Sequence, residues 1–190
     1  MKVIFLDIDG VLVHSNYKNQ ETKNIDESKI KLLKKIIEET SAKIVLTSNW
    51  RTPCIENGKI YRQPEYYTLS SLLKKYGIDI YDQTPLHKLK FLQNEDLQKL
   101  DKPIKSRFDP ITTRAGEIFT YLETNKEIQS FIIIDDEDSE WEYFDLDKNL
   151  IKTNYDDKGL KEEHIRQIIE ILGKSNTKTI NRKSKCPKMA

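Results

Sequence analysis

The sequence predicts an α/β fold in which helices cover both faces of a central parallel sheet, giving three layers. Two observations support this prediction. Three segments, 2–8, 42–48 and 130–136, contain runs that are almost entirely apolar, as strands buried on both faces do. Segments with apolar residues at helical spacing lie between these runs, and such alternation is typical of a parallel sheet. A chain of 190 residues suits a single domain.

The first half of the chain predicts three strands and two helices. After the buried strand at Lys2–Ile8, either Asn24 or Asp26 is placed to cap a helix. The inward stripe of that helix consists of Ile30, Leu33, Ile36 and Ile37. The buried strand "AKIVLTS" follows, and then a helix at Tyr66–Tyr76 that ends at Gly77. The short strand "IDIYD" completes this half.

The second half begins with a polar, irregular stretch at about 82–113 that contains three prolines, and we expect it to form a small insertion or lip. A helix at Arg114–Asn125 should turn Ile118, Phe119 and Leu122 inward. The third buried strand, "SFIIIDD", follows it. A short strand at Leu150–Lys152 and a helix at about 157–172 complete the domain, which we expect to span residues 1–173.

Charge is unevenly distributed along the chain. The segment 174–190 carries six Lys or Arg and no acid, so the net charge of +1 leaves about −5 (+1 minus 6) on the rest. We expect this basic tail to be disordered or a linker, and contact with nucleic acid or an anionic membrane is the alternative.

Three features of the chain bear on its location. No apolar run approaches the ~18–20 residues of a membrane span, so we expect no transmembrane segment. The predicted strand at residue 2 leaves no room for a signal peptide, and the two cysteines make no disulfide framework. These features predict a cytoplasmic protein, with delivery into another cell as the alternative.

Polar side chains follow all three buried strands. In order along the chain they are Asp7 and Asp9, Thr47 and Ser48, and Asp135 and Asp136. Ligands bind beyond the carboxyl ends of the strands in sheets of this kind, so these residues predict a site. If the chain stays extended through Ile8, the carboxylates of Asp7 and Asp9 face the same side.

Clustered carboxylates repel one another unless a hard cation lies among them, and Mg²⁺ is the cation that suits carboxylate oxygens and phosphate. Thr47 and Ser48 offer hydroxyl groups, and Arg114 offers a fork suited to phosphate. These groups predict a phosphoryl site. Asp7 can then act as a nucleophile that forms an aspartyl-phosphate, and Asp9 as its acid and base.

At this point the sequence resembles the haloacid dehalogenase (HAD) superfamily. "FLDIDGV" resembles its first motif, "KIVLTS" its second and "IIIDD" its acidic fourth, in the family's order. The resemblance implies a Rossmann-like sheet and an Mg²⁺-dependent hydrolase of the small capless bacterial phosphatase type. Asp7 and Asp9 are its implied catalytic residues. The implied metal ligands are Asp7, Asp136 with Asp135 in support, and the backbone carbonyl of Asp9.

The resemblance assigns phosphate binding to Thr47, with Ser48 as the alternative. The family's third motif is usually a lysine, and here the match is looser. Arg114 fits it best, with Lys105 and Arg107 as alternatives. Asp138 is a candidate outer-shell partner of the metal site.

Neither gap between the motifs is long enough for a full cap domain, so the resemblance implies an open site and a macromolecular substrate. We expect a phosphoprotein, in particular one carrying phosphotyrosine, because several aromatic residues lie near the motifs: Trp50, Tyr61, Tyr66, Tyr67, Trp141 and Tyr143. The competing hypothesis is a phosphatase of nucleic-acid ends, of the RNA-repair type. A small-metabolite phosphatase and a non-catalytic phospho-receiver module are less favoured hypotheses.

Overall fold

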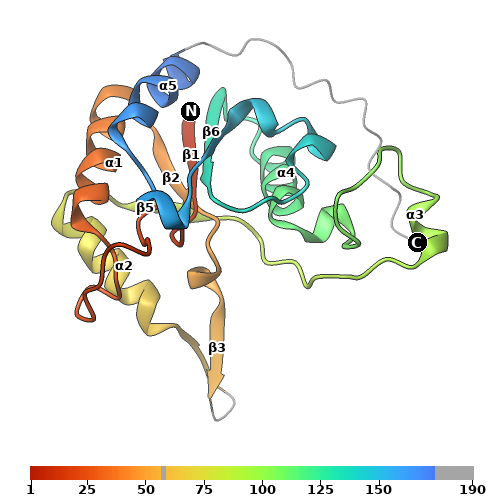
Figure 1. Cartoon of the computed structure of the whole chain (residues 1–190), viewed down its shortest axis with the longest axis horizontal. Helices are drawn as coiled ribbons and strands as arrows, with labels where there is room; N and C mark the ends of the chain where they lie inside the picture. The colour runs from red at the N-terminus through yellow and green to blue at the C-terminus, as the bar shows by residue number, and fades with distance from the viewer. Residues whose placement is uncertain (57–58, 174–190) are drawn as a thin grey trace.

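A five-stranded parallel sheet forms the centre of the protein in the computed structural model, which describes residues 1–56 and 59–173 (Figure 1). The predicted basic tail, 174–190, lies outside the described residues. The strand order is β5-β2-β1-β6-β7, and every neighbouring pair is parallel. The strands are β1 (Lys2–Leu6), β2 (Lys43–Leu46), β5 (Ile80–Gln83), β6 (Ser130–Asp135) and β7 (Leu150–Lys152).

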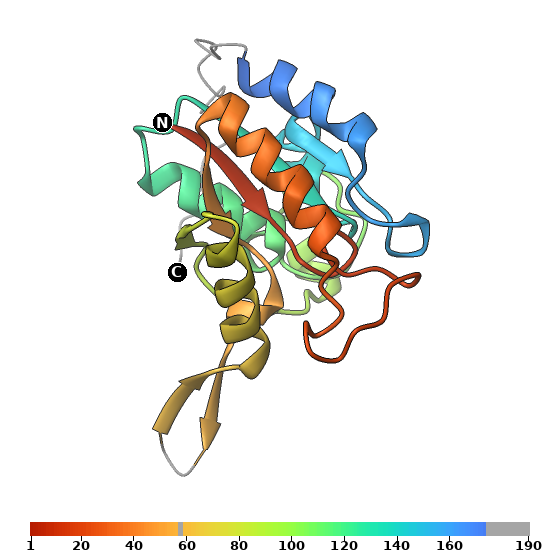
Figure 2. The same ribbon diagram turned by 90° about the vertical axis from the view of Figure 1, so that its left-hand side faces the viewer.

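Helices cover both faces of this sheet, which confirms the predicted three-layer α/β fold (Figure 2). Ile4 and Leu6 point to a core beneath α1 (Glu27–Thr40), α2 (Pro64–Lys75) and α5 (Glu162–Gly173). Val3 and Phe5 point to the other core, beneath α4 (Arg114–Thr124) and the short helix η3 (Trp141–Phe144). Successive strand residues alternate between the two faces, so one continuous apolar strand supplies both cores.

Local signals set most element ends. The Asp26 carboxylate, and not that of Asn24, caps α1 by accepting a hydrogen bond from the backbone N–H of Ser28 at 2.8 Å. Gly77 follows α2 with a φ of +74°, as predicted for its stop. In α4, Phe119 is only half-buried, because its ring stacks on Phe144 with centroids 4.8 Å apart and so leaves the core.

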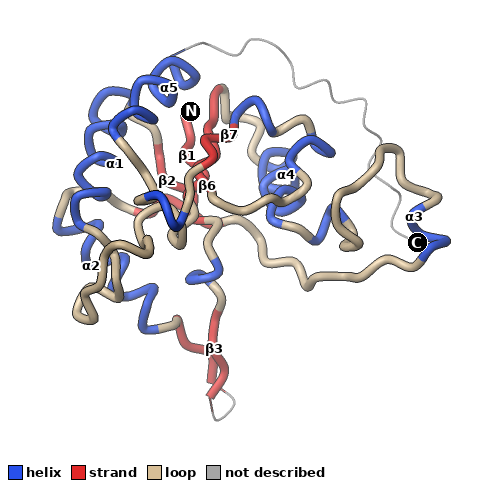
Figure 3. Tube along the Cα trace, in the orientation of Figure 1, coloured by secondary structure: helices blue, strands red, loops and turns tan. Residues whose placement is uncertain are grey.

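Two segments of the chain extend away from the central sheet, a hairpin and an irregular insertion. The antiparallel hairpin of β3 (Pro53–Glu56) and β4 (Lys59–Arg62) was not predicted, and it projects away from the body (Figures 1 and 2). The predicted irregular insertion begins at Thr84, because Asp82 and Gln83 belong to β5. It contains only two short helices, α3 (Asn94–Leu97) and η2 (Pro110–Thr112), and is otherwise loop (Figure 3).

We call residues 84–109 of this insertion the arm. The remaining short helices are η1 (Asn49–Arg51), η4 (Asp147–Asn149) and η5 (Tyr155–Asp157). In the part of the chain that the structure describes, no helix has both the length and the apolar character that crossing a bilayer requires.

Candidate active site

The carboxyl ends of three adjacent strands bring the predicted site residues to one edge of the sheet. The N–H of Asp7 donates to the Ile134 carbonyl on β6 at 3.0 Å, and the N–H of Thr47 donates to the Leu6 carbonyl at 2.9 Å. Asp7 therefore lies between Thr47 and Asp135. All three side chains are buried, and Asp7 is 2% exposed. Parallel pairing produces this arrangement because it places every strand end on the same edge.

The chain turns sharply after Ile8. The strand ends at Leu6, and the backbone N–H groups of Leu12 and Val13 both donate to the Ile8 carbonyl. Gly10 in this turn has a φ of +71°, and a Cβ placed on it would collide with the Asp136 side chain. The glycine therefore permits both the left-handed backbone and the close approach of Asp136.

This turn begins only after Ile8, so it separates Asp9 from the strand end that carries Asp7. Asp7 is buried, whereas Asp9 is exposed and its Oδ2 accepts a hydrogen bond of 2.8 Å from Trp50 Nε1. Partial desolvation by the surrounding protein nevertheless raises the pKa of Asp9, and the Trp50 hydrogen bond opposes that rise. The two carboxylates thus occupy different environments, which is the arrangement that assigns them different chemical roles.

Asp7, Asp135 and Asp136 form an acid cluster in which one oxygen of each carboxylate lies within 4.8 Å of the others. Burial raises the pKa of Asp7 to about 7, with Arg114 opposing the rise and Asp135 adding to it. Burial also raises the pKa of Asp135 and of Asp136. Without a further positive charge, Asp7 is thus only partly ionised near neutral pH.

Arg114 supplies one positive charge to this cluster from the first residue of α4. Its Nη1 lies 3.1 Å from Asp7 Oδ2 and 2.9 Å from Asp135 Oδ2. Burial alone would lower the pKa of Arg114, but Asp135 and Asp7 raise it, so the guanidinium stays charged. The two competing candidates for this role lie elsewhere, because Lys105 pairs with Glu142 at the surface and Arg107 is exposed on the arm.

The hydroxyl groups after β2 have different surroundings. The Thr47 side chain is fully buried, and within the described residues its Oγ1 has no hydrogen-bond partner. Ser48 caps η1, and its Oγ accepts from the N–H of Trp50 at 3.4 Å. A buried hydroxyl without a partner costs free energy, so Thr47 has the stronger need for a ligand.

Sequence reasoning assigned no role to Arg51, which is 1% exposed and forms a buried ion pair with Glu117 of α4. Arg51 Nη1 also donates to the carbonyls of Thr47 and Ser48, and Nε donates to that of Thr84. These contacts fasten the loop after β2 to the neighbouring strand end and to α4. The only signal in the sequence was the Trp-Arg pair that follows the second motif.

A cleft of about 650 Å³ lies between the arm and the loop after β6. Arg114 lines it, which places the acid cluster beside the cleft. The other lining residues are Asn49, Thr52, Leu86, His87, Lys88, Leu89, Ser106, Phe108, Thr112, Thr113, Glu117, Glu137, Asp138, Ser139 and Glu140. This volume falls within the range of ligand sites, about 300–1,000 Å³.

The acid cluster fits a magnesium ion. Three carboxylates and one guanidinium leave a charge of about −2 (−3 plus 1), which one divalent cation balances. Asp7 Oδ1 is also buried without a hydrogen-bond partner in the described part of the chain. Oxygen ligands of this kind suit Mg²⁺.

The carboxylates of two further acids, Asp9 and Asp138, are not part of this cluster. The carboxylate of Asp9 bonds to Trp50, which leaves its backbone carbonyl as the ligand that the resemblance implies. Asp138 pairs with Lys152 at 3.0 Å instead of joining the three acids.

Comparison with known families gave a match that covers most of the chain. A family model described as "HAD domain in Swiss Army Knife RNA repair proteins" matches residues 3–165. The matched range contains every residue of the acid cluster, Arg114 and the whole arm. Neither the curated proteins nor the solved structures gave a match.

Proposed function

The chain belongs to the family of HAD domains found in Swiss Army Knife RNA repair proteins, and from this premise we propose that it is an Mg²⁺-dependent phosphatase of RNA ends. Membership supports a hydrolase of the phosphatase class. The observation that carries the proposal is the position of Arg114, which lines the cleft and whose Nη1 contacts both Asp7 and Asp135. An acid held in this way has a fixed position and a neighbouring charge suited to phosphate.

In the proposed first step, an oxygen of Asp7 attacks the phosphorus atom of the terminal phosphate. The bond from phosphorus to the leaving oxygen breaks, and that oxygen takes a proton from Asp9. The products of this step are a free hydroxyl on the substrate and an aspartyl-phosphate on Asp7. Asp9 suits this role because its side chain is exposed while partial desolvation by the surrounding protein raises its pKa.

In the second step, Asp9 takes a proton from water, and the water oxygen attacks the phosphorus atom. The bond to Asp7 breaks, which releases inorganic phosphate and restores both carboxyl groups. Arg114 and the hydroxyl of Thr47 hold the phosphoryl oxygens in the proposal. When bound by Asp7, Asp136 and Asp135, Mg²⁺ supplies the positive charge that ionises Asp7 and polarises the phosphoryl group.

RNA ends replace the phosphoprotein that the sequence favoured, for two reasons. The family's description places such domains in RNA repair proteins. Two of the aromatic residues on which the phosphotyrosine expectation relied have other roles, because Trp141 lies in the core at 5% exposure and the Trp50 N–H donates to Asp9. Tyr66 packs edge-on against Tyr67 on α2.

The test compares substrate classes in Mg²⁺ and in EDTA. Single-stranded RNA with a 3′ or 5′ phosphate, phosphotyrosine and phosphoserine peptides, and p-nitrophenyl phosphate are supplied in parallel. We expect kcat/KM to be highest for one of the RNA ends, and turnover to stop in EDTA. A preference for either peptide would contradict the proposed substrate.

Two substitutions test the proposed roles of Asp7 and Asp9. Asp7→Asn should reduce turnover of every substrate to background, and Asp9→Asn should reduce it by about 10²–10⁴-fold. Asp147→Asn, in the exposed helix η4, is the matched control and should retain full activity. Full activity in Asp7→Asn would exclude the aspartyl-phosphate route.

A further inference from the structure

The arm carries a group of exposed apolar side chains. Among the described residues, nine large apolar side chains are exposed. Four of these nine belong to the arm: Leu86, Leu89, Phe91 and Phe108. Phe91 is 53% exposed and Phe108 is 37% exposed. Exposed apolar groups gathered on one segment mark a binding surface more often than a solvated loop.

The same arm is basic. Its outgoing stretch, 84–92, and its returning stretch, 103–108, contain Lys88, Lys90, Lys105 and Arg107 and no acidic residue. Lys88 and Arg107 form no ion pair within the described part of the chain, whereas Lys90 pairs loosely with Asp109 at 4.0 Å. Exposed aromatic rings set among unpaired cations are typical of surfaces that bind single-stranded nucleic acid.

The two stretches lie side by side and hold the rings together. Backbone N–H groups of Leu92 and Asp109 donate to the carbonyls of Arg107 and Lys90, each at 2.8 Å. The Phe91 and Phe108 rings meet edge to face with centroids 6.0 Å apart. The aromatic pair therefore has a defined position on the arm.

Two buried acids fix the arm to the body. Glu117 accepts from the N–H of His87 at 2.8 Å, and Glu140 accepts from the N–H groups of Lys105 and Ser106 at 2.9 and 2.6 Å. Both carboxylates are thereby occupied, although they line the cleft. Of the remaining acids in the cleft, Asp138 pairs with Lys152, and Glu137 lies 3.7 Å from Arg114.

The arm is also continuous with the candidate active site. Phe108 and Lys88 line the same cleft as Arg114, which contacts the acid cluster. A chain that lies in this cleft with its terminal phosphate beside Arg114 has its next nucleotides within reach of Lys88 and Phe108. A single aryl phosphate has no groups that extend that far.

We propose that the arm binds the single-stranded segment adjoining the terminal phosphate, with bases on Phe91 and Phe108 and backbone phosphates on Lys88 and Arg107. This inference rests on the proposed function and specifies the form of its substrate. Unpaired bases expose faces to the rings, whereas a duplex buries them, so the arm selects single strands.

The test uses two arm variants, Phe91→Ala/Phe108→Ala and Lys88→Gln/Arg107→Gln, in Mg²⁺. The substrates are end-phosphorylated RNA of about ten nucleotides, a phosphopeptide and p-nitrophenyl phosphate. We expect each variant to lower kcat/KM for RNA by about tenfold or more, through KM, because each stacked base and each phosphate contact adds affinity. Turnover of p-nitrophenyl phosphate should change by less than about twofold.

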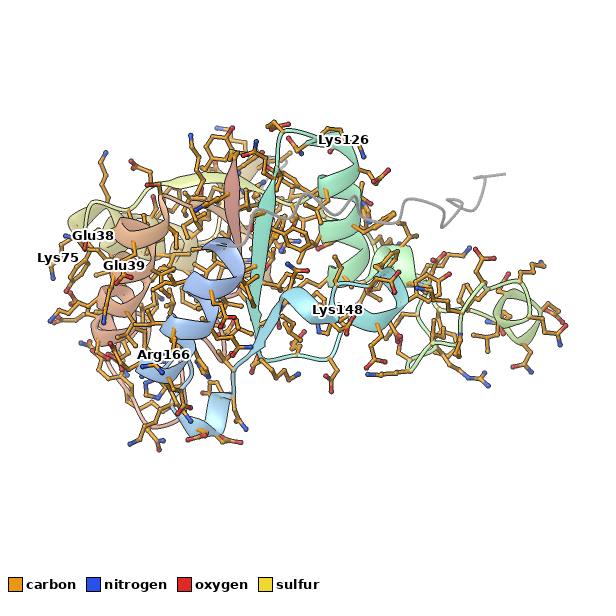
Figure 4. All side chains as sticks on the ribbon, turned by 90° about the horizontal axis from the view of Figure 1, so that it is seen from above. Glu38, Glu39, Lys75, Lys126, Lys148 and Arg166 are labelled. Atoms are coloured by element: carbon orange, nitrogen blue, oxygen red, sulfur yellow. The ribbon has the colours of Figure 1, made fainter. Side chains whose placement is uncertain are left out.

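The salt dependence of RNA binding distinguishes a variant that has lost charge contacts from one that has lost its fold. For single strands the slope of log affinity against log salt is about −0.7 per phosphate contact, so Lys88→Gln/Arg107→Gln should flatten the slope by about 1.4. The control Lys126→Gln/Arg166→Gln removes two charges that lie away from the arm (Figure 4) and should leave the slope unchanged. Thermal melts identify a variant that has lost its fold.

Three results would overturn the inference. Arm variants with wild-type kcat/KM for RNA would overturn it while leaving the proposed function intact. Variants that lose turnover of the phosphopeptide but not of RNA would assign the arm to a protein partner. A wild-type protein that hydrolyses p-nitrophenyl phosphate but no phosphorylated RNA would overturn both proposals together.

Discussion

At the scale of single residues, Trp50 connects the loop after β2 to Asp9. Its indole N–H donates to Asp9 Oδ2 at 2.8 Å, although Asp9 lies 41 residues earlier in the chain. The hydrogen bond orients the exposed carboxylate and favours its ionised form. Trp50 is therefore a positioning residue for the proposed acid and base, a role that no pattern in the sequence had indicated.

Replacing this donor gives a prediction. Trp50→Phe keeps an aromatic ring but removes the N–H group, so we expect kcat to fall by about tenfold with little change in KM. The pKa of Asp9 should rise, because burial raises it and the hydrogen bond that opposed burial is gone. The limb of the pH–rate profile that reports Asp9 should move to higher pH. An unchanged kcat and profile would show that Asp9 does not need this contact.

At the scale of elements, the buried pair of Arg51 and Glu117 joins three parts of the chain. Arg51 follows β2, Glu117 lies on α4 66 residues later, and Glu117 also holds the arm through His87. Burial lowers the pKa of Arg51 and the Glu117 charge opposes that effect. An ion pair of this kind specifies geometry, because either charge alone is costly in the interior.

A double-mutant cycle tests the coupling between Arg51 and Glu117. Arg51→Met and Glu117→Gln should each lower the free energy of unfolding by about 3–5 kcal/mol, because each leaves the partner buried without its counterpart. The double variant should lose less than the sum. Urea unfolding measures all three. Lys35→Met breaks an exposed pair with Glu162 and is the control, with an expected change of at most about 1 kcal/mol. Additive losses would show that the two side chains do not depend on each other.

The β3–β4 hairpin is the element that sequence reasoning missed. The pair Asn57-Gly58 stands between two short stretches that contain Ile55 and Ile60, and such a pair is a strong hairpin signal. Ile55 and Ile60 face solvent, at 71% and 72% exposure, so the hairpin lacks the buried apolar run by which the sheet strands were recognised.

At the scale of the whole molecule, the acid cluster makes the stability of the fold depend on pH. The pKa of Asp7 is raised by burial from 3.8 to about 7 in the folded chain. A carboxyl group whose pKa is higher in the folded than in the unfolded chain stabilises the fold while it is protonated. This contribution to stability is lost as the pH rises from about 4 through 7. Above that range the folded protein holds a costly negative charge, which the proposed Mg²⁺ would neutralise.

This linkage predicts a pH-dependent metal effect. Mg²⁺ should raise the melting temperature relative to EDTA more at about pH 8 than at about pH 5.5, because the ligands must lose their protons before the ion binds. Differential scanning calorimetry at both values measures the shift. Asp136→Asn removes one carboxylate of the cluster and should reduce the shift at the higher pH. Equal shifts at the two pH values would contradict binding by Asp7.

The sequence by itself determined the sheet, its layers and the edge that carries the site. Apolar runs and helical spacing are local properties, and parallel pairing then brings the strand ends together. Only the tertiary structure decided which side chains meet at that edge. The choice of Arg114 over Lys105 and Arg107 depended on how α4 packs, since its contact with Asp135 spans 21 residues. The arm beside the cleft likewise depended on packing, because contacts between distant residues leave no periodic signal in the sequence.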